Sequence, residues 1–103
     1  MLVHSVYFWL EKNLTHDQRQ TFHEELEKLR GIEVIRTIYI GKPAPTDRPA
    51  VDRTYDVALT ILLDDMNGHD IYQKHPLHRQ FLDQCSGFWT KVVIYDHQAL
   101  GDA

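Results

Sequence analysis

The order of local patterns in this sequence predicts an α+β fold: a four-stranded antiparallel sheet with two helices on one face. Stretches rich in strand-forming residues occur at four places. A helical pattern separates the first stretch from the second, and another separates the third from the fourth. The chain has 103 residues, which fits one domain over 1–103. A further observation, apolar residues on both sides of the first strand, predicts that two copies associate.

The first predicted strand, Leu2–Leu10, alternates between two sides that are both largely apolar. One side carries Leu2, His4, Val6, Phe8 and Leu10, and the other carries Val3, Ser5, Tyr7 and Trp9. A helix over 16–30 is expected next, because Thr15 is a good N-cap and Gln18 stands where a capping box needs it. Gly31 is expected to end this helix in the left-handed conformation.

The second half of the chain continues the pattern around a long loop. Strands are predicted over 34–40 and 55–63, with the odd-numbered residues of the latter on one side. The residues between them hold three of the four prolines, so we expect a surface loop there. Asp65 opens a helical region that Pro76 interrupts, and 88–95 is the fourth predicted strand.

The βαββαβ order, joined by right-handed crossovers, gives a ferredoxin-like sandwich. Its two helices cover one face only, so the apolar side that carries Val3, Tyr7 and Trp9 would be exposed in a monomer. We therefore expect a homodimer in which the two sheets pack together and close an α/β barrel. The alternative is a monomer in which polar residues such as Ser5 and Arg36 leave the second face of the sheet solvated.

Composition excludes several classes of partner. There are 11 basic and 15 acidic residues, a net charge of −4, and the basic residues form no cluster. We expect neither nucleic acid nor a membrane surface as a partner. The single cysteine, Cys85, cannot form an internal disulfide, and the N-terminus has no signal-peptide pattern. The sequence therefore predicts a cytoplasmic protein.

The seven histidines do not show a metal-site spacing. His75 and His78 are three residues apart, but Pro76 fits the first position of a helix and leaves His75 outside as its cap. We expect no zinc site, only a weak and incidental divalent ion at most. No glycine-rich phosphate loop is present, so no cofactor is expected. Four other histidines fit solvated or helix-edge positions: His16, His23, His69 and His97.

Tyr72 and His78 are the candidates for chemistry. A phenol and an imidazole that face one pocket can act as an acid and a base, because the pKa of histidine lies near neutrality. The tyrosine hydroxyl can also donate a hydrogen bond to an oxygen that gains negative charge. The spacing leaves open whether the two groups converge; a helix-start histidine and a tyrosine at the core edge are the structural alternative.

Three segments resemble the stress-responsive dimeric α/β-barrel domain family. They are HSVYFWL at His4–Leu10, YDVAL at Tyr55–Leu59, and YQKHPLH at Tyr72–His78 followed by Phe81. The resemblance implies the dimeric βαββαβ barrel, in agreement with the fold predicted above. A polyketide-cyclising relative in this family uses a tyrosine and a histidine at the positions of Tyr72 and His78, which implies that these two are catalytic here.

The resemblance also implies a pocket between the helices and the sheet. Its expected lining is His4, Val6, Phe8, Phe22, Leu26, Leu59, Ile61, His75, Phe81, Trp89, Val92 and Ile94. Two positions differ from the cyclase: Val57 replaces a histidine, and Leu82 replaces a glycine and is expected to narrow the cavity. The substrate is therefore not predicted to be the same.

Three functional hypotheses follow. The first is a cofactor-free binder of a small hydrophobic or phenolic molecule, or a lyase- or cyclase-type enzyme, with Tyr72 and His78 as acid and base. The second is a non-catalytic dimeric interaction protein in which these residues only organise the second helix. The third, based on shared architecture alone, is a cofactor-independent monooxygenase.

Overall fold

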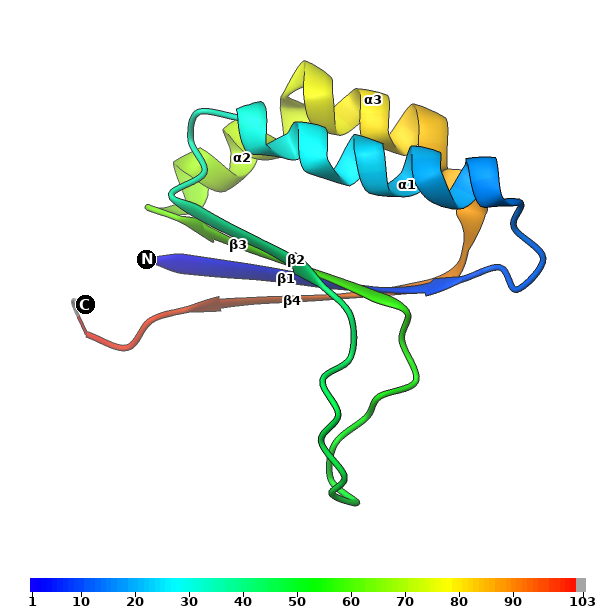
Figure 1. Cartoon of the computed structure of the whole chain (residues 1–103). Coiled ribbons are helices and arrows are strands. Elements are labelled where there is room, and N and C mark those ends of the chain that lie inside the picture. The colour runs from blue at the N-terminus through cyan, green and yellow to red at the C-terminus, as the bar shows by residue number, and fades with distance from the viewer. Residues whose placement is uncertain (102–103) are drawn as a thin grey trace.

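The computed structural model describes residues 1–101 and shows the predicted strand and helix order (Figure 1). The elements in chain order are β1 (Leu2–Leu10), α1 (His16–Lys28), a 3₁₀ turn (Leu29–Gly31), β2 (Thr37–Gly41), β3 (Val57–Leu63), α2 (Met66–Lys74), α3 (Pro76–Cys85), a second 3₁₀ turn (Ser86–Phe88) and β4 (Trp89–Gln98). The ferredoxin-like α+β prediction is confirmed, and the second helical region is divided into two short helices.

The four strands form one antiparallel sheet in the order β2-β3-β1-β4. β1 is central and pairs with both β3 and β4. In this register His4 lies opposite Ile61 on one neighbour and opposite Asp96 on the other. Side chains at paired positions point to the same face of a sheet, so the register places His4 and Asp96 together on the helix-covered face.

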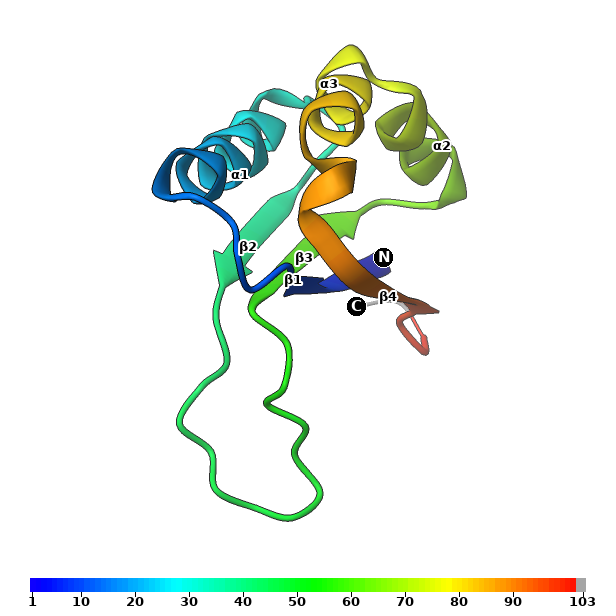
Figure 2. The ribbon, with the colours of Figure 1, turned by 90° about the vertical axis from the view of Figure 1, so that its right-hand side faces the viewer.

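The helices all lie on one face of the sheet, and α1 and α3 pack side by side above it (Figures 1 and 2). The alternation of β1 and β3 is regular: every second residue of each strand is buried beneath the helices. The buried apolar core consists of Leu2, Val6, Phe8, Leu10, Phe22, Leu26, Leu29, Ile32, Val57, Leu59, Ile61, Leu63, Tyr72, Phe81 and Cys85.

The start of α1 matches the prediction and its end does not. The Thr15 side chain accepts from the backbone of Gln18, and the Gln18 side chain accepts in return from the backbone of Thr15. The α-helix ends at Lys28, and a 3₁₀ turn takes the chain to Gly31. The left-handed conformation expected at Gly31 is wrong, since Gly101 alone has a positive φ among the described residues. A Cβ at Gly31 would lie 3.1 Å from Leu77, so close packing against α3 accounts for the glycine.

The interruption at Pro76 is confirmed and divides the second helical region. Asp65 is the N-cap of α2, where its side chain accepts from the backbone N–H of Gly68. His75 ends α2 and caps α3: its Nδ1 accepts from the backbone N–H of Leu77, and Pro76 occupies the first helical turn. This junction sets the angle between the two helices, and the candidate site depends on it.

Strand boundaries differ from the sequence-based ranges by up to three residues. The second strand begins at Thr37 rather than residue 34, because the apolar side chains of Val34 and Ile35 pack against the core from a turn. The third begins at Val57; Tyr55 leaves the predicted side and contacts Tyr7, with ring centroids 5.0 Å apart. The fourth strand runs from Trp89 to Gln98, further along the chain than predicted.

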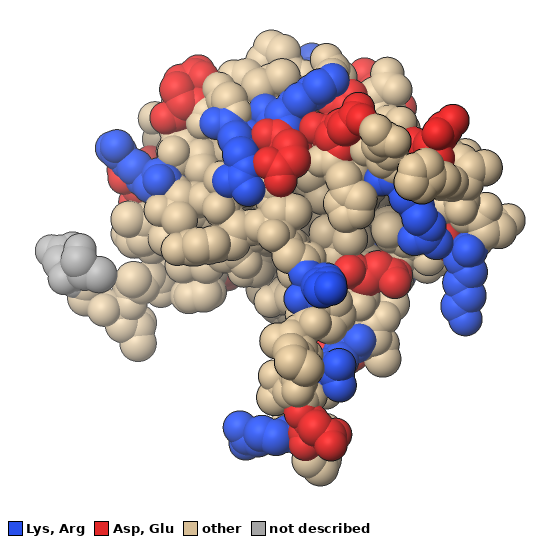
Figure 3. Space-filling view, viewed as in Figure 1, with Lys and Arg blue, Asp and Glu red and all other residues tan. Residues whose placement is uncertain are grey.

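The face of the sheet opposite the helices carries aromatic side chains and a long loop. The loop between β2 and β3 projects away from the sheet on this side (Figures 1 and 2). Trp9 donates from Nε1 to the hydroxyl of Thr54 in the loop, at 2.9 Å. Charged residues of both signs lie interspersed over the helical layer and again along the loop (Figure 3). None of the helices in residues 1–101 has the length and apolar composition that crossing a membrane requires.

Candidate functional site

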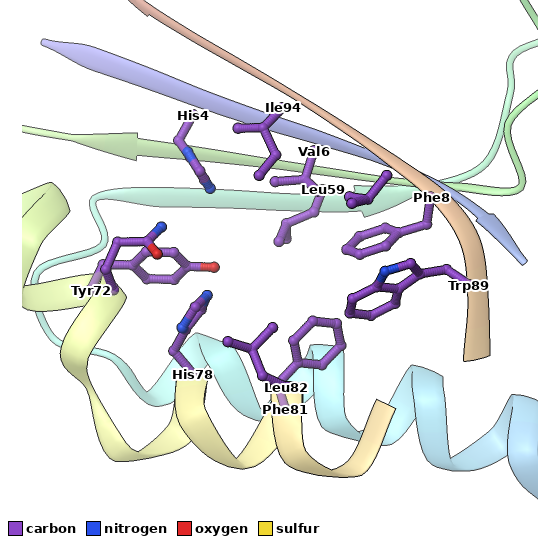
Figure 4. Close-up of a pocket in the computed structure, with 12 residues that line it drawn as sticks. His4, Val6, Phe8, Leu59, Tyr72, His78, Phe81, Leu82, Trp89 and Ile94 are labelled. Atoms are coloured by element: carbon purple, nitrogen blue, oxygen red, sulfur yellow. The ribbon is translucent and has the colours of Figure 1, made fainter. Parts of the chain in front are cut away.

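A pocket of about 260 Å³ lies between the sheet and helices α2 and α3 (Figure 4). Its lining is mostly apolar and comes from five elements: β1, β3, α2, α3 and β4. The lining residues are His4, Val6, Phe8, Leu59, Tyr72, Gln73, His78, Phe81, Leu82, Trp89, Val92 and Ile94. Two titratable residues of the helices, Tyr72 and His78, therefore share this apolar cavity with His4 from the sheet.

Tyr72 and His78 come together because α2 ends between them. Tyr72 lies in the last turn of α2 and His78 in the first turn of α3, on either side of the junction at His75. Their ring centroids are 4.8 Å apart and the rings are inclined by 58°. In Figure 4 the hydroxyl of Tyr72 and the end of the His78 ring point toward the same part of the cavity.

Tyr72 is a neutral hydrogen-bond donor at the pocket wall. The residue is only 1% exposed, and burial raises the pKa of its hydroxyl well above the ordinary value of 10.0. A phenol in an apolar site keeps its proton because the phenolate would lose its hydration. The hydroxyl is thus held in the form that can donate to a ligand oxygen.

His78 is held in the neutral form. The residue is 9% exposed, and its Nδ1 is buried without a hydrogen-bond partner of good geometry. Burial lowers the pKa of His78 below 6.5; the nearby Gln73 backbone acts in the opposite direction, and charge on His4 or His69 lowers the pKa further. A neutral imidazole near pH 7 is a proton acceptor, as a general base must be.

An aspartate holds His4 in place by a hydrogen bond on the side of the ring away from the pocket. Its Nδ1 lies 2.5 Å from Oδ1 of Asp96, and its ring packs edge-on against Tyr72 with centroids 5.5 Å apart. The other end of the His4 ring points into the pocket (Figure 4). A carboxylate at Nδ1 favours the tautomer with hydrogen on Nδ1, which leaves Nε2 as an acceptor on the pocket side.

Sequence analysis did not identify two residues that lie beside His4, namely Asp96 and His69. Asp96 was not singled out, although the pairing of the first and last strands could have placed it beside His4. His69 was assigned a solvated or helix-edge position, but its side chain is only 16% exposed. It stacks edge-on against His4 at 5.3 Å. His4, His69 and Asp96 each present one possible ligand atom, all within 4.8 Å of one another.

The structure places eight of the twelve residues expected around the pocket in its lining and four elsewhere. Phe22 and Leu26 of α1 and Ile61 of β3 are fully buried in the core. They pack the helix layer onto the sheet rather than facing the cavity. His75 is turned away to cap α3, and its Nε2 lies 3.5 Å from a carboxylate oxygen of Glu33.

The cavity has an apolar mouth that sequence analysis described in part. Leu82, whose bulk was expected to narrow the cavity, lines it and is half-exposed. Val92 and Ile94 on β4 are also half-exposed, so the entrance is bordered by aliphatic side chains. Gln73 lines the pocket without having been predicted. An apolar molecule would lose less hydration free energy than a polar one on entering the pocket by this route.

Comparison with known proteins gives the same architecture. The family model "Stress responsive A/B Barrel Domain" matches residues 2–99. A dimeric ferredoxin-like protein of unknown function from Thermobifida fusca is 25% identical; the match covers 95% of this chain and 90% of that one, with a TM-score of 0.77. A Dabb family protein from Mesorhizobium loti is 23% identical over 97% of both chains, with a TM-score of 0.76.

A third solved structure is that of an enzyme. The hydroxynitrile lyase from Passiflora edulis is 14% identical, the match covers 93% of this chain and 90% of the lyase, and the TM-score is 0.75. At this identity the likeness is one of fold. No curated protein matches the sequence significantly.

Proposed function

We propose a function for this chain on the basis that it belongs to the stress responsive A/B barrel domain family. The chain binds a small hydrophobic carbonyl or phenolic compound and acts on it without a cofactor. Tyr72 serves as the hydrogen-bond donor and His78 as the base. One observation carries the proposal: Tyr72 and His78 point into the same apolar cavity, where burial favours the protonated phenol and the neutral imidazole (Figure 4).

The chemistry that suits this pair is proton abstraction next to a carbonyl group. His78 takes the proton, the C–H electron pair becomes the new C=C bond, and negative charge moves to the carbonyl oxygen. Tyr72 donates a hydrogen bond to that oxygen, which stabilises the enolate most when water is excluded. An aldol-type cyclisation begins with this step, and so does a lyase reaction that expels a group β to the carbonyl. The protonated His78 then returns its proton to the product.

The size of the cavity restricts the ligand to about one substituted ring. An apolar cavity of about 150 Å³ accommodates benzene, and this pocket measures about 260 Å³. The walls at Phe8, Phe81 and Trp89 are aromatic, and these three rings contact one another with centroids 5.1–5.9 Å apart. A planar ring can stack there while its polar group lies between Tyr72 and His78.

The proposal includes a homodimer formed through the uncovered face of the sheet. Tyr7 and Tyr95 lie on that face with ring centroids 6.3 Å apart, and Tyr95 is 64% exposed. A continuous aromatic surface of this kind is uncommon on a monomer. The relative from Thermobifida fusca is described as dimeric. A cytoplasmic location belongs to the same proposal, since the one cysteine is buried and free.

The test is an NMR titration of the full chain, with the ring resonances of His78 as the reporter. The probes are acetophenone, phenol and benzaldehyde, with cyclohexane as the apolar control. We expect saturable shifts at His78 and small shifts at His16, which lies at the exposed start of α1. If none of the probes moves His78 in the folded protein, the proposed site is wrong.

A non-catalytic dimeric interaction protein is the second candidate, and one contact favours it. The Tyr72 and His78 rings pack directly across the α2–α3 junction, so they could serve only to hold the two helices together. In that case His78→Ala lowers the free energy of unfolding and changes no activity. A folded His78→Ala variant that has lost ligand binding excludes this candidate.

A further inference from the structure

We propose that His4, His69 and Asp96 form a binding site for one divalent transition-metal ion of the Zn²⁺ type, beside the pocket and separate from the Tyr72–His78 pair. The three side chains come from β1, α2 and β4, which are remote in sequence. This is why the search for local metal-ligand spacing did not find them.

The ligand atoms already converge. Nδ1 of His4 lies 2.5 Å from Oδ1 of Asp96, and Nε2 of His69 lies 3.7 Å from Oδ2 of the same carboxylate. The three ligand atoms fall within 4.8 Å of one another. Ligand atoms at about 2.0–2.2 Å from a tetrahedral zinc ion lie about 3.3–3.6 Å apart, so the His69–Asp96 pair already fits, whereas the hydrogen-bonded atoms of His4 and Asp96 would have to move apart by about 1 Å. Small side-chain rotations would therefore complete the coordination.

A hydrogen bond to Asp96 accounts for the buried position of the His4 ring, whereas no hydrogen bond accounts for that of the His69 ring. The side chain of His69 is only 16% exposed, and its Nδ1 is buried with no hydrogen-bond partner. Its Nε2 is too far from Asp96 for a hydrogen bond, at 3.7 Å. A largely buried imidazole without partners costs free energy unless something else satisfies it. An ion between His69, His4 and Asp96 would bind Nε2, and Nδ1 would then carry the ring hydrogen and face the Asp70 carboxylate, 3.7 Å away.

The donor set selects the class of ion. Two imidazole nitrogens and one carboxylate suit Zn²⁺, Co²⁺ or Ni²⁺, whereas Ca²⁺ and Mg²⁺ prefer oxygen ligands. Asp70, with a carboxylate oxygen 3.7 Å from Nδ1 of His69, adds negative charge near the site. The partly exposed Asp96 gives the ion a route from solvent. Three protein ligands leave a fourth position open for water.

Metal binding would change what His4 presents to the pocket. With Asp96 as its only partner, His4 carries hydrogen on Nδ1 and offers an acceptor, Nε2, to the cavity. A metal ion on Nδ1 requires the hydrogen to reside on Nε2, which then becomes a donor. The ion would thus alter which ligand groups fit next to Tyr72, without itself contacting the pocket.

The experiment is a Co²⁺ titration of the tag-free full chain, followed by displacement with Zn²⁺. We expect one ion per chain, visible absorption bands from the bound Co²⁺, and shifts of the His4 and His69 ring resonances before those of other histidines. His69→Ala and Asp96→Asn should each weaken binding at least tenfold, because even the loss of an outer-shell partner costs about 10–100-fold.

His97→Ala is the matched control, since His97 is exposed and adjacent to Asp96 in sequence. It should leave the affinity unchanged. The proposal is overturned if the wild-type chain binds no stoichiometric ion, or if His97→Ala weakens binding as much as His69→Ala does. His69→Ala and Asp96→Asn each remove one metal-coordinating group, so the proposal can still be tested with one variant if the other folds poorly. The pocket titration with organic probes is done without metal, so the two proposals can fail independently.

Discussion

Replacement of Tyr72 by phenylalanine isolates the hydroxyl on which the proposed chemistry depends. The ring of Tyr72 is buried against His4 and His78, and phenylalanine keeps these contacts while removing the oxygen. Because the hydroxyl faces the cavity, its loss should affect ligands that carry a hydrogen-bond acceptor and leave purely apolar ligands unaffected (Figure 4).

The magnitude follows from the strength of one neutral hydrogen bond. Such a bond contributes about 0.5–1.5 kcal/mol net, which corresponds to a factor of about 2–13 in the dissociation constant. A reaction that builds negative charge on the ligand oxygen should lose more. Removal of one oxyanion donor costs about 10²–10³ in kcat. The free energy of unfolding should change by less than about 1 kcal/mol, because no core contact is removed.

Acetophenone and ethylbenzene make a suitable pair of probes, because they are similar in shape and differ in the carbonyl oxygen. Isothermal titration of the wild-type chain and of Tyr72→Phe with both probes gives a thermodynamic cycle. We expect weaker acetophenone binding in the variant and equal ethylbenzene binding. Equal losses for both probes would mean that the substitution disturbed the pocket. Unchanged binding of acetophenone would mean that the hydroxyl does not contact the ligand.

Three further predictions concern stability and assembly. The free energy of unfolding should fall as the pH drops below about 6.5. Unfolded His78 then binds a proton that folded His78, with its lowered pKa, does not bind. Urea titrations of wild type and His78→Gln at about pH 7.5 and 5.5 should show a smaller pH dependence of this free energy in the variant. Phe22→Ala should destabilise the chain by about 3–5 kcal/mol in urea titrations, since the ring is fully buried between Phe8 and Phe81; a cost below about 1 kcal/mol would contradict this placement. Tyr95→Arg should give the mass of one chain in light scattering, while Asp83→Arg on the exposed side of α3 should not; a dimeric Tyr95→Arg variant would exclude the proposed interface.

The fold could be predicted because each element is encoded locally. The alternation in Leu2–Leu10 and the capping box at Thr15 depend on neighbours a few residues away, and both are present as expected. The boundary errors have a different origin. Val34 and Ile35 have strand-forming side chains, but tertiary packing uses them in a turn. Local preference cannot distinguish an apolar residue that pairs from one that only packs.

The site was harder to predict because its members meet through tertiary structure. The pairing of His4 with Asp96 depends on the register between the first and last strands, 92 residues apart. His69 joins them only because α2 lies over that end of the sheet. Alternation predicted that His4, Val6 and Phe8 share one side of β1, and the family resemblance placed them at a pocket. Phe22 and Leu26, also placed there by the resemblance, face the core because of how α1 is rotated.

The break between α2 and α3 connects the structural and the catalytic interpretations of Tyr72 and His78. In one continuous helix, residues six positions apart would be rotated by about 600°, or about 120° away from facing the same way. Only one of the two rings could then face the cavity. His75 and Pro76 end the first helix and start the second in a new direction, which brings both rings to the same pocket. The capping residues are thus required for the proposed acid–base pair, and a structural role for His75–Leu77 does not argue against chemistry at Tyr72 and His78.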